Sequence, residues 1–157
     1  MIKEKEDFFK RDEYFTPLED DVRVSVENFK RHELECPCCH LMNLPDKFIL
    51  ILQAFSYYLD FKFGKHITLN VGSAYRCQKH NAEVGGVPGS QHYADGIMKL
   101  GAADLSSPDL EPSILYQNAI LFGIFRSVKF YPEKNFVHVD INPERNRCHA
   151  WVEGNKK

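Results

Sequence analysis

The sequence between residues 127 and 141 is SVKFYPEKNFVHVDI, in which two short apolar-rich runs flank a polar segment. The first run covers residues 127–131 and the second covers residues 136–141. The four residues between them, PEKN, begin with proline and have the composition of a turn. We therefore expect a β-hairpin here, and its second strand carries two polar groups, His138 and Asp140.

The second strand of this hairpin is expected to have one apolar and one polar face. Successive side chains of a strand point to opposite faces, so Val137, Val139 and Ile141 are predicted to pack on the core. His138 and Asp140 then project together from the other face, with their Cα atoms about 6–7 Å apart. A single histidine on a strand is more often a surface residue than a ligand, so its role depends on the other polar motifs of the chain.

Two helices are expected before the hairpin. Apolar residues recur at three- and four-residue spacing over residues 48–63, after Pro45 and before Gly64, which predicts a long buried helix. A second helix is predicted over residues 111–122, before Gly123. Its inward face is expected to contain Ile114, Leu115, Leu121 and Phe122.

Two short strands and a long loop complete the expected elements. The strands are predicted over residues 67–71 and 103–105. The segment 72–91 between them is rich in glycine and proline and is expected to be a loop. A loop of this length in a small domain usually carries function.

Composition narrows the class of protein. A chain of 157 residues with 43% hydrophobic residues is sufficient for one packed core, and we expect a charged arm over residues 1–29 followed by one domain over residues 30–157. The net charge of -2, without a basic stripe, argues against general binding to nucleic acid or anionic membranes. No apolar run resembles a signal peptide or a membrane span, so we expect the chain to be cytoplasmic as synthesised. We also expect it to be a monomer.

The cysteines offer a separate possibility. Five cysteines, an odd number without a secretion signal, argue against a disulfide framework. Cys36 and Cys39 have the spacing of a metal knuckle, and Cys77 with His80 repeats it. If these four residues converge, they would hold a structural zinc ion; the alternatives are small buried thiols with a surface histidine, or a redox module.

Three other residues with metal-ligand chemistry stand in separate motifs. His92 ends GSQH, Asp104 ends GAAD, and His138 lies in FVHVD. Two imidazoles and one carboxylate, with a fourth position left to water, make up a catalytic zinc site. These residues predict a metal-dependent hydrolase.

Five motifs, in this order, resemble those of the M15 peptidases, the zinc D-alanyl-D-alanine carboxypeptidases and related peptidoglycan endopeptidases, including phage endolysin domains. They are SAYRC (73–77), Asn81 with VGGVP (84–88), SQH (90–92), GAAD (101–104) and FVHVD (136–140). The resemblance covers residues 30–152. It implies an α+β fold, shared with the Hedgehog signalling domain, in which helices pack on one side of an antiparallel sheet and the metal lies in a groove on the other.

The resemblance also implies roles for individual residues. It assigns the Zn²⁺ ligands as His92, Asp104 and His138. Arg76 would bind a substrate carboxylate or carbonyl with its planar, always-charged guanidinium. Ser90 is expected to form hydrogen bonds at the edge of the groove or to act as a turn residue. Asn81 is expected to contact the peptide backbone of the substrate or to cap a turn.

The spacing of the ligands departs from the family. His92 and Asp104 are twelve positions apart, where relatives usually have seven. An insertion over residues 95–99 must therefore bulge out between them, and Asp95 within it is a competing ligand.

The general base is a second departure. Several branches carry an acid three positions before the last histidine, where this chain has Asn135, and an amide cannot accept a proton from water. Asp140 is the preferred replacement, with Glu133 in reserve. Asp140 is equally suited to fix the tautomer of His138.

The function implied is hydrolysis of peptide bonds in peptidoglycan stem peptides or cross-links, by a carboxypeptidase or endopeptidase released to the cell wall by phage lysis machinery. The sequence does not indicate which bond is cleaved. The alternative is a non-catalytic peptidoglycan-binding or phage structural protein that retains the fold.

Overall fold

A computed structural model describes residues 26–93, 101–142 and 149–154. Most of the expected arm over residues 1–29, and the predicted insertion over residues 95–99 with Asp95, lie outside these ranges. Phe29, at the end of the expected arm, is buried in the core. Among the described helices, none combines the length and hydropathy needed to cross a membrane.

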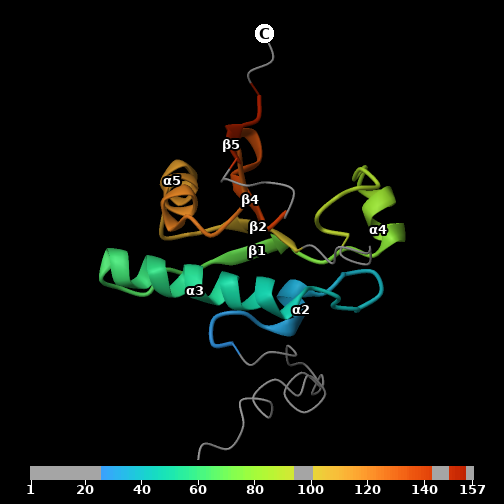
Figure 1. Ribbon diagram of the computed structural model, residues 1–157, viewed down its shortest axis with the longest axis horizontal. Coiled ribbons are helices and arrows are strands. Elements are labelled where there is room, and N and C mark those ends of the chain that lie inside the picture. The colour runs from blue at the N-terminus through green and yellow to red at the C-terminus, as the bar shows by residue number, and fades with distance from the viewer. Residues whose placement is uncertain (1–25, 94–100, 143–148, 155–157) are drawn as a thin grey trace, which may run out of the picture.

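The fold is α+β, as expected, and is built on a five-stranded sheet with the strand order β1-β2-β4-β3-β5 (Figure 1). The first four strands in this order pair antiparallel with their neighbours. The last strand, β5, pairs parallel to β3, so the sheet is mixed rather than wholly antiparallel. The strands are β1 (Asn70–Ser73), β2 (Ala102–Ser106), β3 (Ser127–Tyr131), β4 (Phe136–Asp140) and β5 (His149–Val152).

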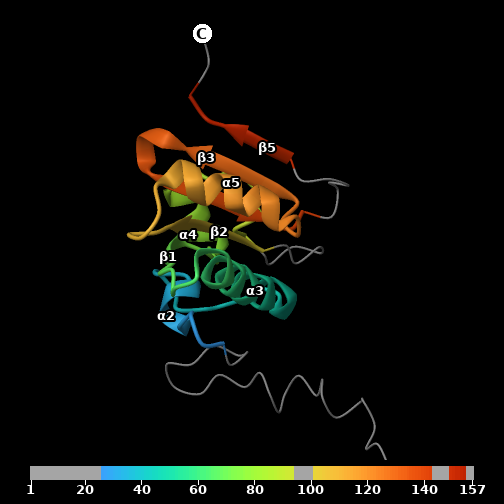
Figure 2. The ribbon, with the colours of Figure 1, turned by 90° about the vertical axis from the view of Figure 1, so that its left-hand side faces the viewer.

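The two long helices, α3 (Asp46–Phe63) and α5 (Pro112–Phe122), cover the same face of the sheet (Figure 2). The short helix α4 (Gln78–Glu83) lies on the other side, and α2 (Arg31–Leu34) precedes α3. The sequence patterns did not predict α2, α4 or β5. The main helices therefore leave the opposite face of β2 and β4 available for polar side chains.

Helix α3 forms where the periodic apolar pattern predicts it. Asp46 places a carboxylate in the first turn, where it interacts favourably with the positive end of the helix dipole. Phe48, Leu52, Phe55 and Leu59 are fully buried at three- and four-residue spacing. Gly64 ends the helix with a φ of +65°, a left-handed conformation that favours glycine.

Helix α5 ends before Gly123 as predicted, but its inward face differs from the expected one. Leu115 is buried, and Phe122 packs against Phe55 with ring centroids 5.2 Å apart. The prediction was wrong for Ile114 and Leu121, which are 36% and 65% exposed. The face that packs repeats at positions 115, 118, 119 and 122, and it includes a buried asparagine that hydropathy alone does not select.

The predicted hairpin is confirmed. Strands β3 and β4 pair with Val128 opposite Val139, and a 3-10 turn, Pro132–Lys134, joins them. Val137 and Val139 are fully buried, and Ile141 packs partly buried against the same core. The alternation of side chains along β4 therefore places His138 and Asp140 on the face of the sheet that is turned away from α3.

Gly101, at the start of β2, gives a direct test of this packing. A Cβ atom at this position would lie 2.5 Å from Cγ of Phe48, so we expect Gly101→Ala to reduce the free energy of unfolding by about 1–3 kcal/mol through overpacking. Chemical denaturation measures the change. Gly72→Ala is the control, because the nearest atom to its Cβ is the Asp104 carbonyl oxygen at 3.8 Å. Equal stability of both variants would contradict the close packing of β2 on α3.

Candidate metal centre

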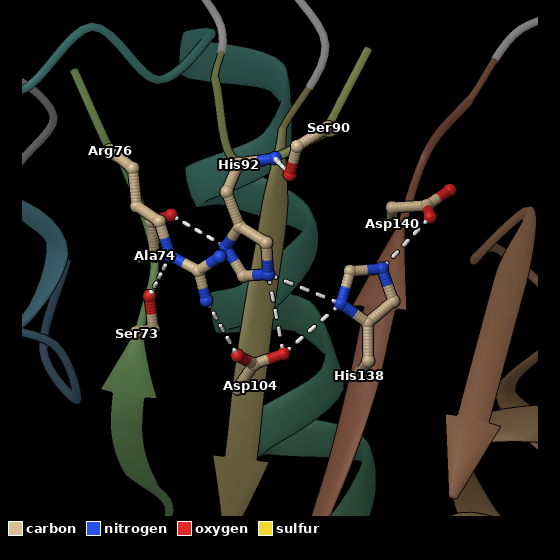
Figure 3. Close-up of polar contacts among 8 residues, drawn as sticks. All are labelled: Ser73, Ala74, Arg76, Ser90, His92, Asp104, His138 and Asp140. Atoms are coloured by element: carbon tan, nitrogen blue, oxygen red, sulfur yellow. Dashed lines mark hydrogen bonds and ion pairs between the residues drawn. The ribbon is translucent and has the colours of Figure 1, made fainter. Parts of the chain in front are cut away.

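His92, Asp104 and His138 come together from three separate elements (Figure 3). Asp104 lies on β2 directly opposite His138 on β4, so the pairing of these two strands makes them neighbours. His92 lies at the end of the loop that follows α4 and is 4% exposed. The three side chains converge although His92 and Asp104 are twelve positions apart in the sequence.

The three donor atoms form a small triangle. His138 Nδ1 is 3.0 Å from Asp104 Oδ1, His92 Nε2 is 3.3 Å from the same oxygen, and the two nitrogens are 3.2 Å apart. A zinc ion bound tetrahedrally at about 2.0–2.2 Å from such donors spaces them about 3.3–3.6 Å apart. The three sides lie at or slightly below the lower end of this range, so a small widening of the triangle would accommodate one zinc ion.

Hydrogen bonds on the far side of each imidazole define which nitrogen is available. His92 Nδ1 is 2.7 Å from the Ala74 carbonyl oxygen, which only accepts, so Nδ1 carries the proton and Nε2 keeps a free lone pair. His138 Nε2 is 3.0 Å from Asp140 Oδ2 and donates to it, which leaves Nδ1 as the donor atom toward a metal. Both of these nitrogens face Asp104 Oδ1, and each would have to be deprotonated to coordinate a metal.

Buried charges surround the centre. Burial raises the pKa of Asp104, but hydrogen bonds from His138 and His92 outweigh it and hold that pKa well below its usual range. Burial lowers the pKa of His138, yet hydrogen bonds to Asp104 and Asp140 raise it to about 9. One histidine thus lies between two buried carboxylates, an arrangement that attracts a cation.

Asp140 lies behind His138, on the side away from the triangle (Figure 3). Its Oδ2 accepts from His138, its Oδ1 accepts from the backbone N–H of Asn142 at 3.0 Å, and the residue is 4% exposed. These contacts are those of a carboxylate that orients a ligand. Glu133, the reserve candidate for the base, is exposed in the turn at the other end of β4.

Arg76 adjoins the triangle. Its Nη2 lies 3.3 Å from Asp104 Oδ2 and its Nε donates to Ser73 Oγ at 2.9 Å. Its backbone N–H also donates to the His92 carbonyl oxygen at 2.9 Å. Arg76 therefore holds the second oxygen of Asp104. It also lines a hollow of about 280 Å³ formed by residues of α2, β1 and α4, and none of the three ligand candidates lines this hollow.

Ser90 and Asn81 serve the loop that carries His92. Ser90 Oγ accepts from the His92 backbone N–H at 3.3 Å. Asn81 is buried, and its Nδ2 donates to the Val87 carbonyl oxygen at 2.9 Å. The backbone of Gly86 approaches so closely that a Cβ there would lie 2.1 Å from Asn81 Oδ1. These contacts match the turn roles that were the alternatives for both residues.

Two contributors to the centre were missed in the sequence. The Ala74 carbonyl holds His92, and the Ser73 hydroxyl holds Arg76. The position of Ser73 in the SAYRC motif was a usable signal, because a hydroxyl three residues before an arginine suits a local hydrogen bond. Every residue has a main-chain carbonyl, so the residue type at position 74 does not indicate that its carbonyl holds His92.

Comparison with known families agrees with this geometry. A family model described as Peptidase M15 matches residues 27–140, which include all three metal-ligand candidates. The chain belongs to the M15 peptidase family. No curated protein and no solved structure matches it significantly. M15 peptidases are generally zinc-dependent, and this M15 peptidase carries a donor set that suits zinc.

The contact between Asp140 and His138 predicts an effect on metal affinity. Asp140→Asn removes the charge that fixes the imidazole, so we expect zinc to bind about 10–100-fold more weakly. Competition with a chromogenic chelator measures the affinity. Asp109→Asn is the matched control, because Asp109 is an exposed carboxylate bonded to the Thr68 backbone N–H. Unchanged affinity in Asp140→Asn would remove the orienting role.

Proposed function

We propose that this M15 peptidase is a zinc enzyme that hydrolyses peptide bonds in peptidoglycan stem peptides or cross-links, as a D-Ala-D-Ala carboxypeptidase or an endopeptidase. The observation that carries the proposal is the triangle of two imidazole nitrogens and one carboxylate oxygen with sides of 3.0, 3.2 and 3.3 Å. It lies in a chain that the family match identifies as a peptidase. The choice of a cell-wall substrate rests on the motifs shared with the family.

In this proposal His92 Nε2, Asp104 Oδ1 and His138 Nδ1 hold the zinc ion. Three protein ligands leave a position for water or substrate. When bound, zinc supplies an acidified water and polarises the carbonyl that is attacked. Asp140 keeps His138 in the required tautomer throughout.

Arg76 is the group proposed to bind the substrate. Its Nε and Nη2 are held by Ser73 and Asp104, and among the described residues Nη1 has no hydrogen-bond partner. The guanidinium is thus oriented beside the metal ligands and retains donors for a substrate carboxylate or for the oxygen that becomes negative during attack. Ser90 and Asn81 contribute by holding the loop that carries His92.

Asp140 remains our predicted general base, and its contacts define how that role can be tested. Both carboxylate oxygens are engaged, one by His138 and one by the Asn142 N–H. If Asp140 accepts the proton, Asp140→Asn stays slow even when zinc saturates the centre. If it only orients His138, saturating zinc restores the rate.

The proposed reaction takes place at the cell wall. The substrate lies outside the cytoplasmic membrane, and the protein reaches it as a monomer when phage lysis machinery opens that membrane. Purified protein added to isolated cell walls therefore needs no partner for activity.

Digestion of purified peptidoglycan is the test of the proposed function. We expect the zinc-loaded protein to create new amine ends, a chelator to stop the reaction, and His138→Ala to abolish it because one ligand is lost. Mass analysis of the released peptides identifies the bond. Asp109→Asn serves as an active control. Cleavage that persists in the metal-free protein would overturn the zinc mechanism.

A second candidate function is non-catalytic binding of peptidoglycan, as a wall-binding or phage structural protein. The observation in its favour is Asn135, which stands where several relatives have an acid and adopts a left-handed turn conformation with a φ of +55°. In the digestion assay this function gives protein bound to the wall with zinc present but without new amine ends.

Arg76→Lys tests the substrate role. Lysine keeps the charge but lacks the planar fork, so it cannot hold Ser73 and Asp104 and still face the substrate. We expect kcat/KM to fall about 100-fold with zinc content unchanged. Arg31→Lys is the matched control. Arg31 lies on α2 and forms an ion pair with Glu35, the residue that follows this helix. Full activity in Arg76→Lys would exclude this role.

A further inference from the structure

Four cysteines gather outside the centre described above. Cys36, Cys38 and Cys39 lie in the loop between α2 and α3, and Cys77 is the residue just before α4. Their sulfur atoms all lie within 4.8 Å of one another. The Cys36 and Cys38 sulfurs are 3.5 Å apart, and the Cys38 and Cys77 sulfurs are 3.3 Å apart.

We propose that these four cysteines bind a second zinc ion with a structural role. Four thiolates at about 2.3 Å from one tetrahedral zinc ion lie about 3.8 Å from one another. The separations of 3.3 and 3.5 Å lie slightly below this value, and no pair of these sulfurs is more than 4.8 Å apart. A disulfide joins two sulfurs at about 2.05 Å, whereas all four of these cysteines are free thiols.

A main-chain N–H group helps to stabilise a thiolate in this cluster. The Cys77 sulfur accepts from the His80 N–H at 3.4 Å. Such a donor offsets part of the negative charge that four thiolates bring to one ion.

The loop is folded tightly enough to present three cysteines to one point. The Cys36 N–H donates to the Leu41 carbonyl and the His40 N–H donates to the Cys36 carbonyl, both at 2.8 Å. His40 has a φ of +57°, which reverses the chain immediately after Cys39. Cys38 and Cys39 thereby bring their sulfurs close to that of Cys36.

The ligand set differs from the one that spacing predicted. The fourth ligand candidate is Cys38 rather than His80, whose ring Nδ1 lies 3.9 Å from Glu83 Oε2 while its backbone N–H serves Cys77. A cluster of four thiols also departs from the two-cysteine redox module considered above. The fifth cysteine, Cys148, lies outside the described residues.

A zinc ion here would help to fix the position of the segment that contacts the centre formed by His92, Asp104 and His138. It would tie the loop before α3 to Cys77, which directly follows Arg76. The same segment contains Ala74, whose carbonyl holds His92, and Tyr75, whose N–H donates to the Leu34 carbonyl at 3.1 Å. The segment that orients Arg76 and His92 is thus anchored at both ends. This role requires only a bound ion and does not rest on the proposed peptidase activity.

Metal analysis of the full chain, purified under reducing conditions, tests the inference. We expect two equivalents of zinc in the wild type, one in Cys38→Ser and one in His92→Ala. His80→Ala, which removes the ligand candidate suggested by spacing, should keep both. After replacement of zinc by cobalt, the wild type and His92→Ala should show a thiolate-to-cobalt charge-transfer band that Cys38→Ser lacks.

A measurement on the wild type removes any dependence on the folding of the variants. Titration with p-hydroxymercuribenzoate should release one equivalent of zinc as the thiols react, while the second equivalent leaves only with chelator. Absence of mercurial-sensitive zinc, absence of the charge-transfer band in His92→Ala, or a Cys38–Cys77 disulfide in the reduced preparation each overturns the proposal. A wild-type protein that holds two equivalents of zinc but has no peptidase activity would count against the proposed function alone.

Discussion

The pairing of β2 with β4 is the constraint on which the rest of the molecule depends, because it sets Asp104 opposite His138. Side chains alternate along a strand, so a slip of either strand by one residue would turn its ligand candidate toward the core. Burial of Leu105 and Val137 on the other face of the same two strands opposes that slip. The apolar core therefore maintains the geometry of a polar centre on the opposite face of these two strands.

The centre is a set of buried charges that are paired with one another. His138 lies between Asp104 and Asp140, and Arg76 occupies the remaining oxygen of Asp104. Carboxylates removed from water are costly unless they are paired, and a bound cation could replace the proton of His138 as the partner of Asp104. The contacts with Ala74 and Asp140 hold the far sides of the two rings, so the near-side nitrogens face Asp104 Oδ1 and each other where an ion would bind.

Much of this arrangement could be predicted from local patterns. The hairpin, α3 and the inward placement of Val137 and Val139 follow from periodicity, and the three ligand candidates follow from residue chemistry and motif order. The inward face of α5, the parallel addition of β5 and the choice of Cys38 over His80 could not be predicted. Each depends on contacts between distant segments or on a single backbone angle, such as that of His40, that spacing does not encode.

The strand order has a consequence for the lifetime of the site. β2 and β4 are flanked on both sides by other strands, whereas β1 and β5 form the edges of the sheet. Amide protons of interior strands exchange with solvent only through large-scale opening, while edges fray at little cost in free energy. Two of the three ligand candidates are thus carried by the most slowly exchanging part of the fold, so fluctuations at either border of the sheet leave their spacing unaltered.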